Sequence, residues 1–369
     1  MTKAQDPPSS AEPQLVEVLL PTGDLAGDLA VLTDEFGFRL EMIMPADDPT
    51  TAVLSGYGAR FRLQVCDAPP GTLIWRSDLP SEPRILPGGT RIETTPLSPL
   101  LERPETQHAF AVRRLADEAP WVIGRAGMQY RDLIPDRLGG SIIASHIRIP
   151  DGGPVPDMVH YHTVGFQLIF CYRGWVDLVY EDQGPPFRLE AGNCVIQPPE
   201  IRHRVLHASD NIEVIEIGVP AEHVTTIDHD MALPNAAYNP DRLFRGQRFV
   251  HHRADGAIWR DASRTGFISR DTTIAEHTGG IAAVEVLRRG RGAPVPMQHD
   301  ADIHFTFVMQ GTMTIQADGH SSQRLAAGDA FTLPPGIVAT YADPSDDIEL
   351  LEVALPGPAT LSPTGQGTT

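Results

Sequence analysis

The sequence predicts a mainly β protein in which a small α+β module precedes a duplicated β domain. Glycine and proline are abundant, with 33 and 34 residues among 369, and they recur between short apolar runs. That pattern is typical of short strands joined by tight turns. The second half of the chain also carries the same set of landmarks twice. At this length we expect two or three domains, each able to bury most of its apolar surface.

Composition and charge exclude several classes of protein. Hydrophobic residues make up 41% and charged residues 21% of the chain, which is typical of a folded globular protein. A formal net charge of −19, with no basic patch evident, argues against nucleic acid and against an anionic membrane as partners. No segment has the apolar length of a signal peptide or a membrane helix. Cys66, Cys171 and Cys194 are widely spaced and odd in number, so we expect free thiols and a cytoplasmic location.

The N-terminal segment is expected to be a flexible tail, 1–13, followed by a module at 14–67. The module has one helix, which carries Leu25, Leu29, Leu32 and Phe36 on one side and ends at Gly37. Strand-like runs stand on both sides of this helix. The predicted elements are a strand at 15–20, a helix at 25–36 and strands at 38–44, 51–54 and 60–65.

This order, with Phe36-Gly37-Phe38 leading out of the helix, resembles one module of the glyoxalase, or vicinal oxygen chelate, family. That family places metal ligands on the first and fourth strands, where this sequence offers only Glu17 and Gln64. We interpret both as ordinary polar strand residues because no histidine accompanies them. A single module is expected to pack on the rest of the chain or to pair with a second subunit. Residues 68–120 follow as a linker rich in proline and poor in periodicity.

The internal repeat begins near residue 121. The two copies are predicted at 121–220 and 264–357, with a linker at 221–263 between them and a flexible tail at 358–369. Their landmarks recur in the same order at a nearly constant offset, which chance seldom produces over a hundred residues. The matching pairs are Gly127 and Gly266, Arg131 and Arg270, Gly174 and Gly311, Gly192 and Gly328, Pro198 and Pro334, and Glu216 and Glu352.

The first copy contains His160-Tyr161-His162, then Gln167 and Gly174, and later Gly192, Pro198 and His203. These residues and spacings resemble the two motifs of the cupin family. The resemblance covers 121–357 and implies a bicupin, two antiparallel jelly-roll barrels. The departures are Pro154, Glu200 and His207, which stand where the family has glycine, glycine and asparagine.

The resemblance implies that His160, His162, Gln167 and His203 face into the first barrel as metal ligands. Two histidines with one residue between them share one face of a strand. Three neutral imidazoles and an amide oxygen suit a divalent transition metal, with Fe expected first and Mn, Ni, Cu or Zn as alternatives. Gln167 replaces an acid, so the site loses the obvious carboxylate base.

Two further residues are candidate catalytic groups. Arg148 shares a strand face with His146, and it either clamps a substrate carboxylate or is solvated on an outward face. His207 is expected, with Val205, on the same strand face as His203. Cys171 is expected to be a buried apolar residue and no nucleophile.

The second copy has lost part of the ligand set, because its positions read Met297, His299, His304 and Ala339. We interpret that barrel as structural. The linker between the copies contains further histidines, which we interpret as solvated. They are His223, His229, His251 and His252.

Bicupins with three histidines resemble ring-cleaving and thiol dioxygenases. The resemblance implies a metal-dependent dioxygenase that acts on a small, oxygen-bearing, anionic or aromatic compound. Two alternatives stay open: a non-redox metal enzyme, such as an isomerase, lyase or cyclase, and a metal-containing binding protein without turnover. The expected partners are a small-molecule substrate and a second copy of the chain in a homodimer.

Overall fold

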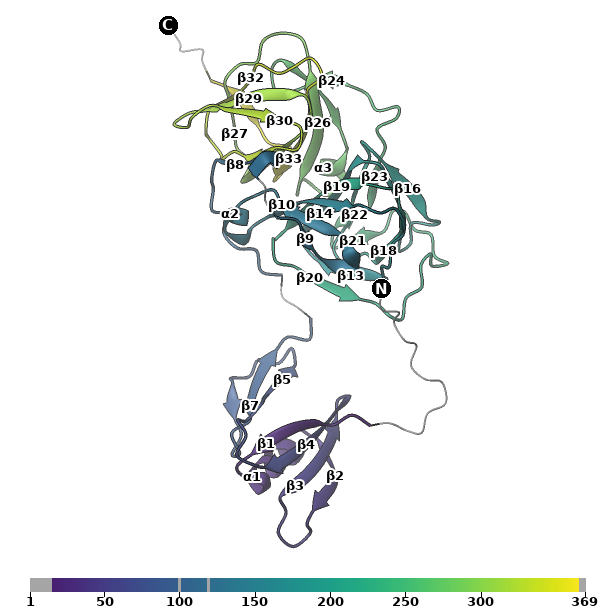
Figure 1. The fold of residues 1–369 in the computed structure, drawn as a ribbon, viewed down its shortest axis with the longest axis vertical. Helices are drawn as coiled ribbons and strands as arrows, with labels where there is room; N and C mark the ends of the chain where they lie inside the picture. Colours follow the sequence, from purple (N-terminus) through teal and green to yellow (C-terminus); the bar gives the residue numbers. More distant parts are fainter. Residues whose placement is uncertain (1–14, 99–100, 118–119, 365–369) are drawn as a thin grey trace. The chain divides into compact units, whose positions relative to one another are not determined.

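The computed structural model describes residues 15–98, 101–117 and 120–364, and it divides the chain into two compact units, 1–100 and 101–369 (Figure 1). The predicted tail at 1–13 therefore lies outside the described residues. Within the described part of the chain, no helix has the length and apolar composition needed to cross a membrane.

The first unit begins with the predicted strand, helix and three strands. These are β1 (Val18–Thr22), α1 (Leu25–Ala30) continued by a turn of π-helix (Val31–Glu35), β2 (Arg39–Met44), β3 (Thr51–Gly56) and β4 (Ala59–Val65). The strands form one sheet in the order β1-β4-β3-β2, with β1 parallel to β4 and the other neighbours antiparallel. The predicted βαβββ order is confirmed.

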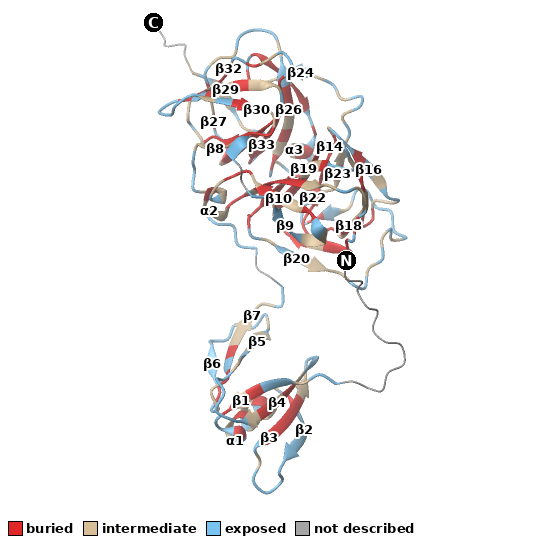
Figure 2. Ribbon diagram, in the orientation of Figure 1, coloured by how far each residue is buried: buried red, intermediate tan, exposed pale blue. Residues whose placement is uncertain are grey.

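Alternation along the strands builds the core of this module. Phe61 and Leu63 on β4 are buried with Leu32 of the helix, while Arg60 and Arg62 point to the other face. Gly37 leaves the helix with a φ of +71°, a backbone conformation that favours glycine. The edge strand β2 is exposed along its whole length (Figure 2).

The segment predicted as a linker at 68–120 contains regular structure. Residues 72–95 form a three-stranded sheet of β5 (Thr72–Arg76), β6 (Arg84–Ile85) and β7 (Arg91–Thr95), with β5 parallel to β7. The chain passes from the first unit to the second at residue 100, inside this segment. The strands β5, β6 and β7 are short and lie among many prolines, so the sequence did not predict them.

The second unit contains two β-barrels, each made of two sheets. In the first barrel one sheet has the order β23-β17-β14-β19-β11-β10-β9, and the other has the order β16-β15-β18-β13-β20, with β12 paired to β18. The strands are β9 (Val122–Ile123), β10 (Gln129–Asp132), β11 (Ile143–Ile149), β12 (Gly153–Pro154), β13 (His160–Thr163), β14 (Phe166–Arg173), β15 (Trp175–Tyr180), β16 (Phe187–Glu190), β17 (Cys194–Ile196), β18 (His203–Ala208), β19 (Ile212–Val219), β20 (Val224–Ile227) and β23 (Val250–His252).

The second barrel repeats this plan with the sheet orders β24-β25-β26-β33-β28-β31-β8 and β30-β29-β32-β27-β34. Its strands are β8 (Ala111–Arg113), β24 (Arg260–Asp261), β25 (Phe267–Asp271), β26 (Ala283–Arg289), β27 (Met297–His299), β28 (Ile303–Gln310), β29 (Thr312–Ala317), β30 (Gln323–Ala326), β31 (Ala330–Thr332), β32 (Ala339–Ala342), β33 (Glu349–Leu355) and β34 (Leu361–Pro363). The mainly β fold and its duplication are confirmed. The strand β34 lies in the segment expected to be a tail.

Short elements complete the second unit. They are the hairpin strands β21 (Leu243–Phe244) and β22 (Gln247–Arg248), the helices α2 (Arg137–Gly140) and α3 (Ile274–His277), and 3-10 turns at Leu115–Asp117 and Arg125–Gly127.

The two barrels exchange strands and share a core. β8 precedes the first barrel in sequence but pairs with β31 of the second, and β23 precedes the second barrel but pairs with β17 of the first. Between the barrels, Phe166 and Phe170 from β14 join Phe305 and Phe307 from β28 in one apolar cluster. A separate apolar cluster fills part of the first barrel's interior and lies beside the predicted metal site.

Candidate metal centre

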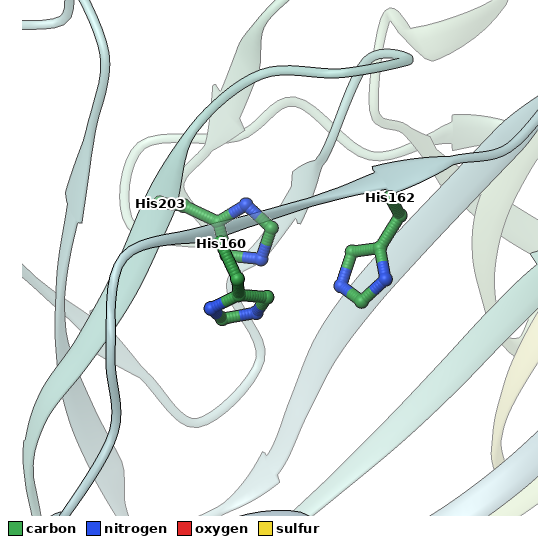
Figure 3. A group of neighbouring side chains, drawn as sticks. All are labelled: His160, His162 and His203. Atoms are coloured by element: carbon green, nitrogen blue, oxygen red, sulfur yellow. The ribbon is translucent and has the colours of Figure 1, made fainter. Parts of the chain in front are cut away.

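Three of the predicted ligands, His160, His162 and His203, come together inside the first barrel (Figure 3). His160 and His162 are alternate residues of β13, so their side chains share one face. His203 stands directly opposite His160 in the antiparallel pair of β13 and β18. The side chains are buried, and one ring nitrogen of each lies within 4.8 Å of one ring nitrogen of the other two.

Hydrogen bonds to backbone carbonyl groups fix which ring nitrogen His160 and His203 present to the group. Nδ1 of His160 donates to the carbonyl oxygen of Met158 at 2.8 Å, and Nδ1 of His203 donates to that of Ile201 at 3.0 Å. Nδ1 of His162 hydrogen bonds to the hydroxyl of Thr225 at 2.9 Å. Carbonyl oxygens accept only, so Nε2 of His160 and His203 is left with a free lone pair. Nε2 of His160 is buried and has no hydrogen-bond partner among the described residues.

The surroundings keep these imidazoles neutral. Burial lowers the pKa of His160, and it lowers the pKa of His162 and His203 well below the usual value. The positive charge of Arg125 acts in the same direction on all three rings. A metal binds the unprotonated form of histidine, so the group is ready to coordinate at neutral pH.

Gln167 is the fourth predicted ligand and lies on β14, buried to 1% exposure. Its amide nitrogen Nε2 donates to Oε1 of Glu216 on β19 at 2.6 Å. Its amide oxygen Oε1 is buried with no hydrogen-bond partner in the described part of the chain. Buried polar atoms are rarely left unpaired. The three imidazole nitrogens fit a divalent first-row metal, and the unpartnered amide oxygen of Gln167 is a further candidate donor.

A cavity of about 440 Å³ opens beside this group. Its walls are mainly apolar, with a few polar side chains, which is typical of a site for a small organic molecule. The lining comprises Met128, Tyr130, Ile143, Ser145, Ile147, Ile149, Ile169, Val176, Leu178, Tyr180, Gln197, Val205, Ile212, Val214, Glu216, Thr225 and His223, together with Arg125, Arg148, His162 and His203. Cys171 lies in the barrel core and not in this lining, and burial raises the pKa of its thiol to about 12.

His207 does not line the cavity. The pairing of β15 with β18 shifts register, because the neighbours Asp177 and Leu178 pair with His207 and Val205. Residue Leu206 is therefore extra, and Val205 and His207 point to opposite faces. The ring of His207 stacks on Trp175 at a centroid distance of 5.7 Å. The expected alternation from His203 to His207 is broken by this irregularity.

Arg148 borders the cavity, but its side chain is engaged elsewhere. Alternate residues of β11 line the cavity, namely Ile143, Ser145, Ile147 and Ile149, and strand alternation directs the side chain of Arg148 to the other face. Its Nε donates to Oε1 of Gln129 at 2.7 Å, and its guanidinium lies 3.9 Å above the ring of Trp121. Both contacts suit the reading in which Arg148 faces outward.

Sequence reasoning missed the arginine that does belong to the site. Arg125 lines the cavity, and its guanidinium forms an ion pair with Asp157, a buried carboxylate. Asp157 also accepts hydrogen bonds from the backbone amides of Met158 and Val205, at 2.9 Å each. It therefore connects the segment that precedes β13 to the neighbouring strand β18. The only sequence signal was the repeat itself, in which Arg125 precedes Gly127 as Arg264 precedes Gly266.

Two further residues belong to the cavity, although the sequence predicted no role in the site for either. Glu216, a landmark of the repeat, lines the cavity and accepts a hydrogen bond from Gln167. The sequence predicts a solvated linker residue at His223, and this prediction is wrong because its ring lines the cavity and lies 5.4 Å from that of His162. Its Nδ1 donates to the carbonyl oxygen of Pro220 at 3.1 Å.

The second barrel has a different interior at the same place. Met297 and Ala339 stand opposite each other, as His160 and His203 do in the first barrel. His299 and His304 stack at 4.4 Å, and Nε2 of His304 lies 3.3 Å from Oε1 of Glu352. The guanidinium of Arg264 pairs with Glu352 at 3.3 Å and lies over the ring of Tyr341. An arginine and a carboxylate thus occupy the interior of this barrel.

Comparison with solved structures identifies the fold. Oxalate decarboxylase from Bacillus subtilis at pH 4.6 matches with a TM-score of 0.52 at 13% identity, over 71% of this chain and 81% of that chain. Salicylate 1,2-dioxygenase from Pseudaminobacter salicylatoxidans matches with a TM-score of 0.51 at 15% identity, over 72% of this chain and 91% of that chain. No protein-family model and no curated protein matches the sequence. At these identities the likeness shows the cupin fold alone.

Proposed function

We propose that this chain is a metal-dependent cupin oxidoreductase, a dioxygenase that acts on a small anionic or aromatic metabolite bearing oxygen. The observation that carries the proposal is the group of His160, His162 and His203 beside an apolar cavity of about 440 Å³. A cavity of this volume suits a small organic molecule.

His160, His162 and His203 would hold the metal through nitrogen, and Gln167 would hold it through Oε1. Fe is the metal we propose first, and Mn, Ni, Cu and Zn suit the same donors. When bound, a redox metal supplies electrons for O2 chemistry and polarises an oxygen of the substrate.

The protein's own side chains would select the substrate. Arg125 presents its guanidinium to the cavity, because its side chain is 34% accessible while its partner Asp157 is 1% accessible. A guanidinium binds a carboxylate in a bidentate geometry and can keep one carboxylate while meeting a second. The apolar walls would pack against the rest of the substrate and exclude water. We therefore propose a substrate with a carboxylate that binds Arg125.

The test is oxygen consumption by the protein reconstituted with Fe(II) under air, with salicylate, related hydroxybenzoates and oxalate as the first panel. The proposal expects O2 uptake with at least one compound and a change in the metal's spectrum when that compound binds. If none of the panel binds or consumes O2 while the protein retains metal, the dioxygenase proposal fails.

A non-redox reaction is the second candidate, and Glu216 is the observation that favours it. Gln167 replaces the carboxylate of the family motif, but Glu216 returns a carboxylate to the cavity from the neighbouring strand. A carboxylate in an apolar cavity can serve as a general base for isomerisation, elimination or decarboxylation. Turnover without O2 in protein loaded with Zn or Ni would favour this candidate. Tight binding of a compound without product would instead establish a binding protein.

We also propose that residues 14–67 form a glyoxalase-like module and that the chain acts as a homodimer. The support for the module is its βαβββ order with β1 beside β4. Glu17 is engaged in ion pairs with Arg60 and Arg62 at 3.0 and 2.6 Å, so it suits the interpretation as an ordinary strand residue. Sedimentation of the full chain beside a variant lacking residues 1–100 would test whether this module carries the dimer contact.

A further inference from the structure

A buried arginine between the two barrels lacks an acidic partner. Arg270 on β25 is 2% exposed, and its NH2 group donates to the carbonyl oxygen of Gly192 in the first barrel at 3.0 Å. Its NH1 group lies 3.4 Å from Nε2 of His252, and its Nε has no hydrogen-bond partner among the described residues. A guanidinium has five N–H donors, so several remain unused. Ion pairs among the described residues include none with Arg270.

The repeat supplies a reference for this arginine. Arg131 on β10 is its counterpart and donates to the carbonyl oxygen of Gly328 in the second barrel at 2.9 Å. In the first barrel Arg131 is paired across the strands with His146, whose Nδ1 lies 3.2 Å from the guanidinium and whose Nε2 lies 2.6 Å from Glu213.

In the second barrel the residue paired with Arg270 is Val286, which offers no hydrogen-bond acceptor. The imidazole beside Arg270 comes instead from His252 on β23, whose Nε2 lies 3.4 Å from NH1. Among the described residues no carboxylate is hydrogen bonded to His252, whereas Arg131 reaches the carboxylate of Glu213 through His146.

Arg270 lines a cavity. A cavity of about 550 Å³ lies at the junction of the barrels and is lined by Arg270, Arg173, Arg288, Trp259 and Glu349, with the ring of Tyr172. Arg173 pairs with Glu213 at 3.1 Å, and Arg288 pairs with Glu349 at 3.3 Å. The two outer arginines are thus neutralised and about half exposed, while Arg270 leaves one positive charge without a counterion at the base.

An uncompensated buried charge is costly, and burial already acts against the charged form of Arg270 and lowers its pKa. A bound anion would remove that cost. Arginine recognises carboxylates and phosphates through two parallel hydrogen bonds, so the fitting ligand carries at least two oxygens on one centre.

We propose that the cleft between the barrels is a binding site for a small oxyanion, a carboxylate or a phosphate, held by Arg270 at the base and by Arg173 and Arg288 at the mouth. This site is separate from the metal centre and would link the barrels through a ligand that touches both. It is independent of the reaction that the metal centre performs.

The test is calorimetric titration of the metal-loaded full chain with inorganic phosphate and, separately, with acetate. Chloride keeps the ionic strength constant. We expect one saturable site per chain for at least one of the two anions, with a dissociation constant at or below about 1 mM. Replacing Arg173→Gln and Arg288→Gln together should weaken binding about tenfold or more, because charge-assisted bonds are lost. Both residues are half exposed, so the variant is expected to fold.

Two controls separate this site from others. Arg148→Gln changes the counterpart of Arg288 in the first barrel and should leave anion binding unchanged. His160→Ala disables the metal centre and should also leave it unchanged. The proposal is overturned if neither anion binds saturably, if the arginine double variant binds as the wild type does, or if binding disappears in His160→Ala, which would assign the anion to the metal centre.

Discussion

Gln167 and Glu216 are joined by a hydrogen bond of 2.6 Å from the amide nitrogen Nε2 to the carboxylate Oε1, across the neighbouring strands β14 and β19. A carboxylate can only accept here, so this bond decides which end of the amide is which. The oxygen of Gln167 is consequently the end left without a partner. The repeat keeps the relationship, since His304 and Glu352 lie 3.3 Å apart at the same positions.

The first prediction is that Glu216→Gln weakens metal binding. The new amide accepts or donates, so it no longer fixes the orientation of Gln167. Loss of a hydrogen bond that orients a ligand typically lowers metal affinity by about 10- to 100-fold. Competition with a chromophoric chelator measures the affinity directly. Glu213→Gln on the same strand, whose side chain contacts His146 and Arg173, serves as the control. Equal affinities in Glu216→Gln and wild type would show that Glu216 does not position the ligand.

The second prediction is that the chain binds one transition metal ion and not two. The first barrel brings three histidines together, whereas the second has Met297 and Ala339 facing each other at the equivalent pair. His203→Ala should abolish stoichiometric metal, and His299→Ala should leave it unchanged. Elemental analysis of protein stripped with chelator and reloaded gives the ratio. Two ions per chain, or metal loss in His299→Ala, would contradict the assignment.

The third prediction separates Arg125 from Arg148 as the group that binds the substrate's carboxylate. Arg125→Gln should raise KM or Kd for anionic ligands about tenfold or more, since a charge-assisted hydrogen bond contributes about 1.5–3 kcal/mol. Arg148→Gln should change them little, because its guanidinium rests on Trp121 and Gln129. Titration of both variants with the same aromatic acid provides the comparison. The reverse ranking would restore Arg148 as the carboxylate clamp.

Much of this arrangement was readable because its signals are local. The pair His160 and His162 shares a face through the period of a strand, and the later His203 follows the turn at Pro198 at a spacing that resembles the cupin motif. The glycines and prolines that mark the repeat stand at turns for which local backbone conformation decides the residue, as at Gly174 and Gly311, both with positive φ.

The features that the sequence did not predict depend on contacts between segments that are distant in sequence, or on irregularities that the local pattern does not show. A one-residue irregularity in β18 turns His207 away, and alternation alone cannot reveal it. Arg125 lines the cavity and is held by an ion pair with Asp157, which is distant from it in sequence. The exchange of β8 and β23 between barrels pairs segments that are distant in sequence, so composition could classify them only as linkers.

The fourth prediction concerns the interior of the second barrel, where Glu285 stands between Asp271 and Glu352 on neighbouring strands. Burial, and then the negative charges of Glu352 and Asp271, raise the pKa of Glu285 from 4.5 to about 7. The folded protein therefore binds this proton more tightly than the unfolded chain does. The contribution of Glu285 to the free energy of unfolding is fully present below a pH of about 4.5, and it is lost as the pH rises through about 7.

Glu285→Gln removes that ionisation. We expect the variant to be more stable than the wild type by about 1–2 kcal/mol at a pH of about 8, and this difference should vanish near a pH of about 4. One pKa unit corresponds to about 1.4 kcal/mol, and partial exposure of the carboxyl group reduces the effect. Urea unfolding of both proteins across this pH range measures it. Glu276→Gln, an exposed acid on the nearby helix α3, should show no such trend. A variant that is destabilised most at alkaline pH would mean that the Glu285 carboxylate is a favourable partner of Arg264, whose charge opposes the raised pKa.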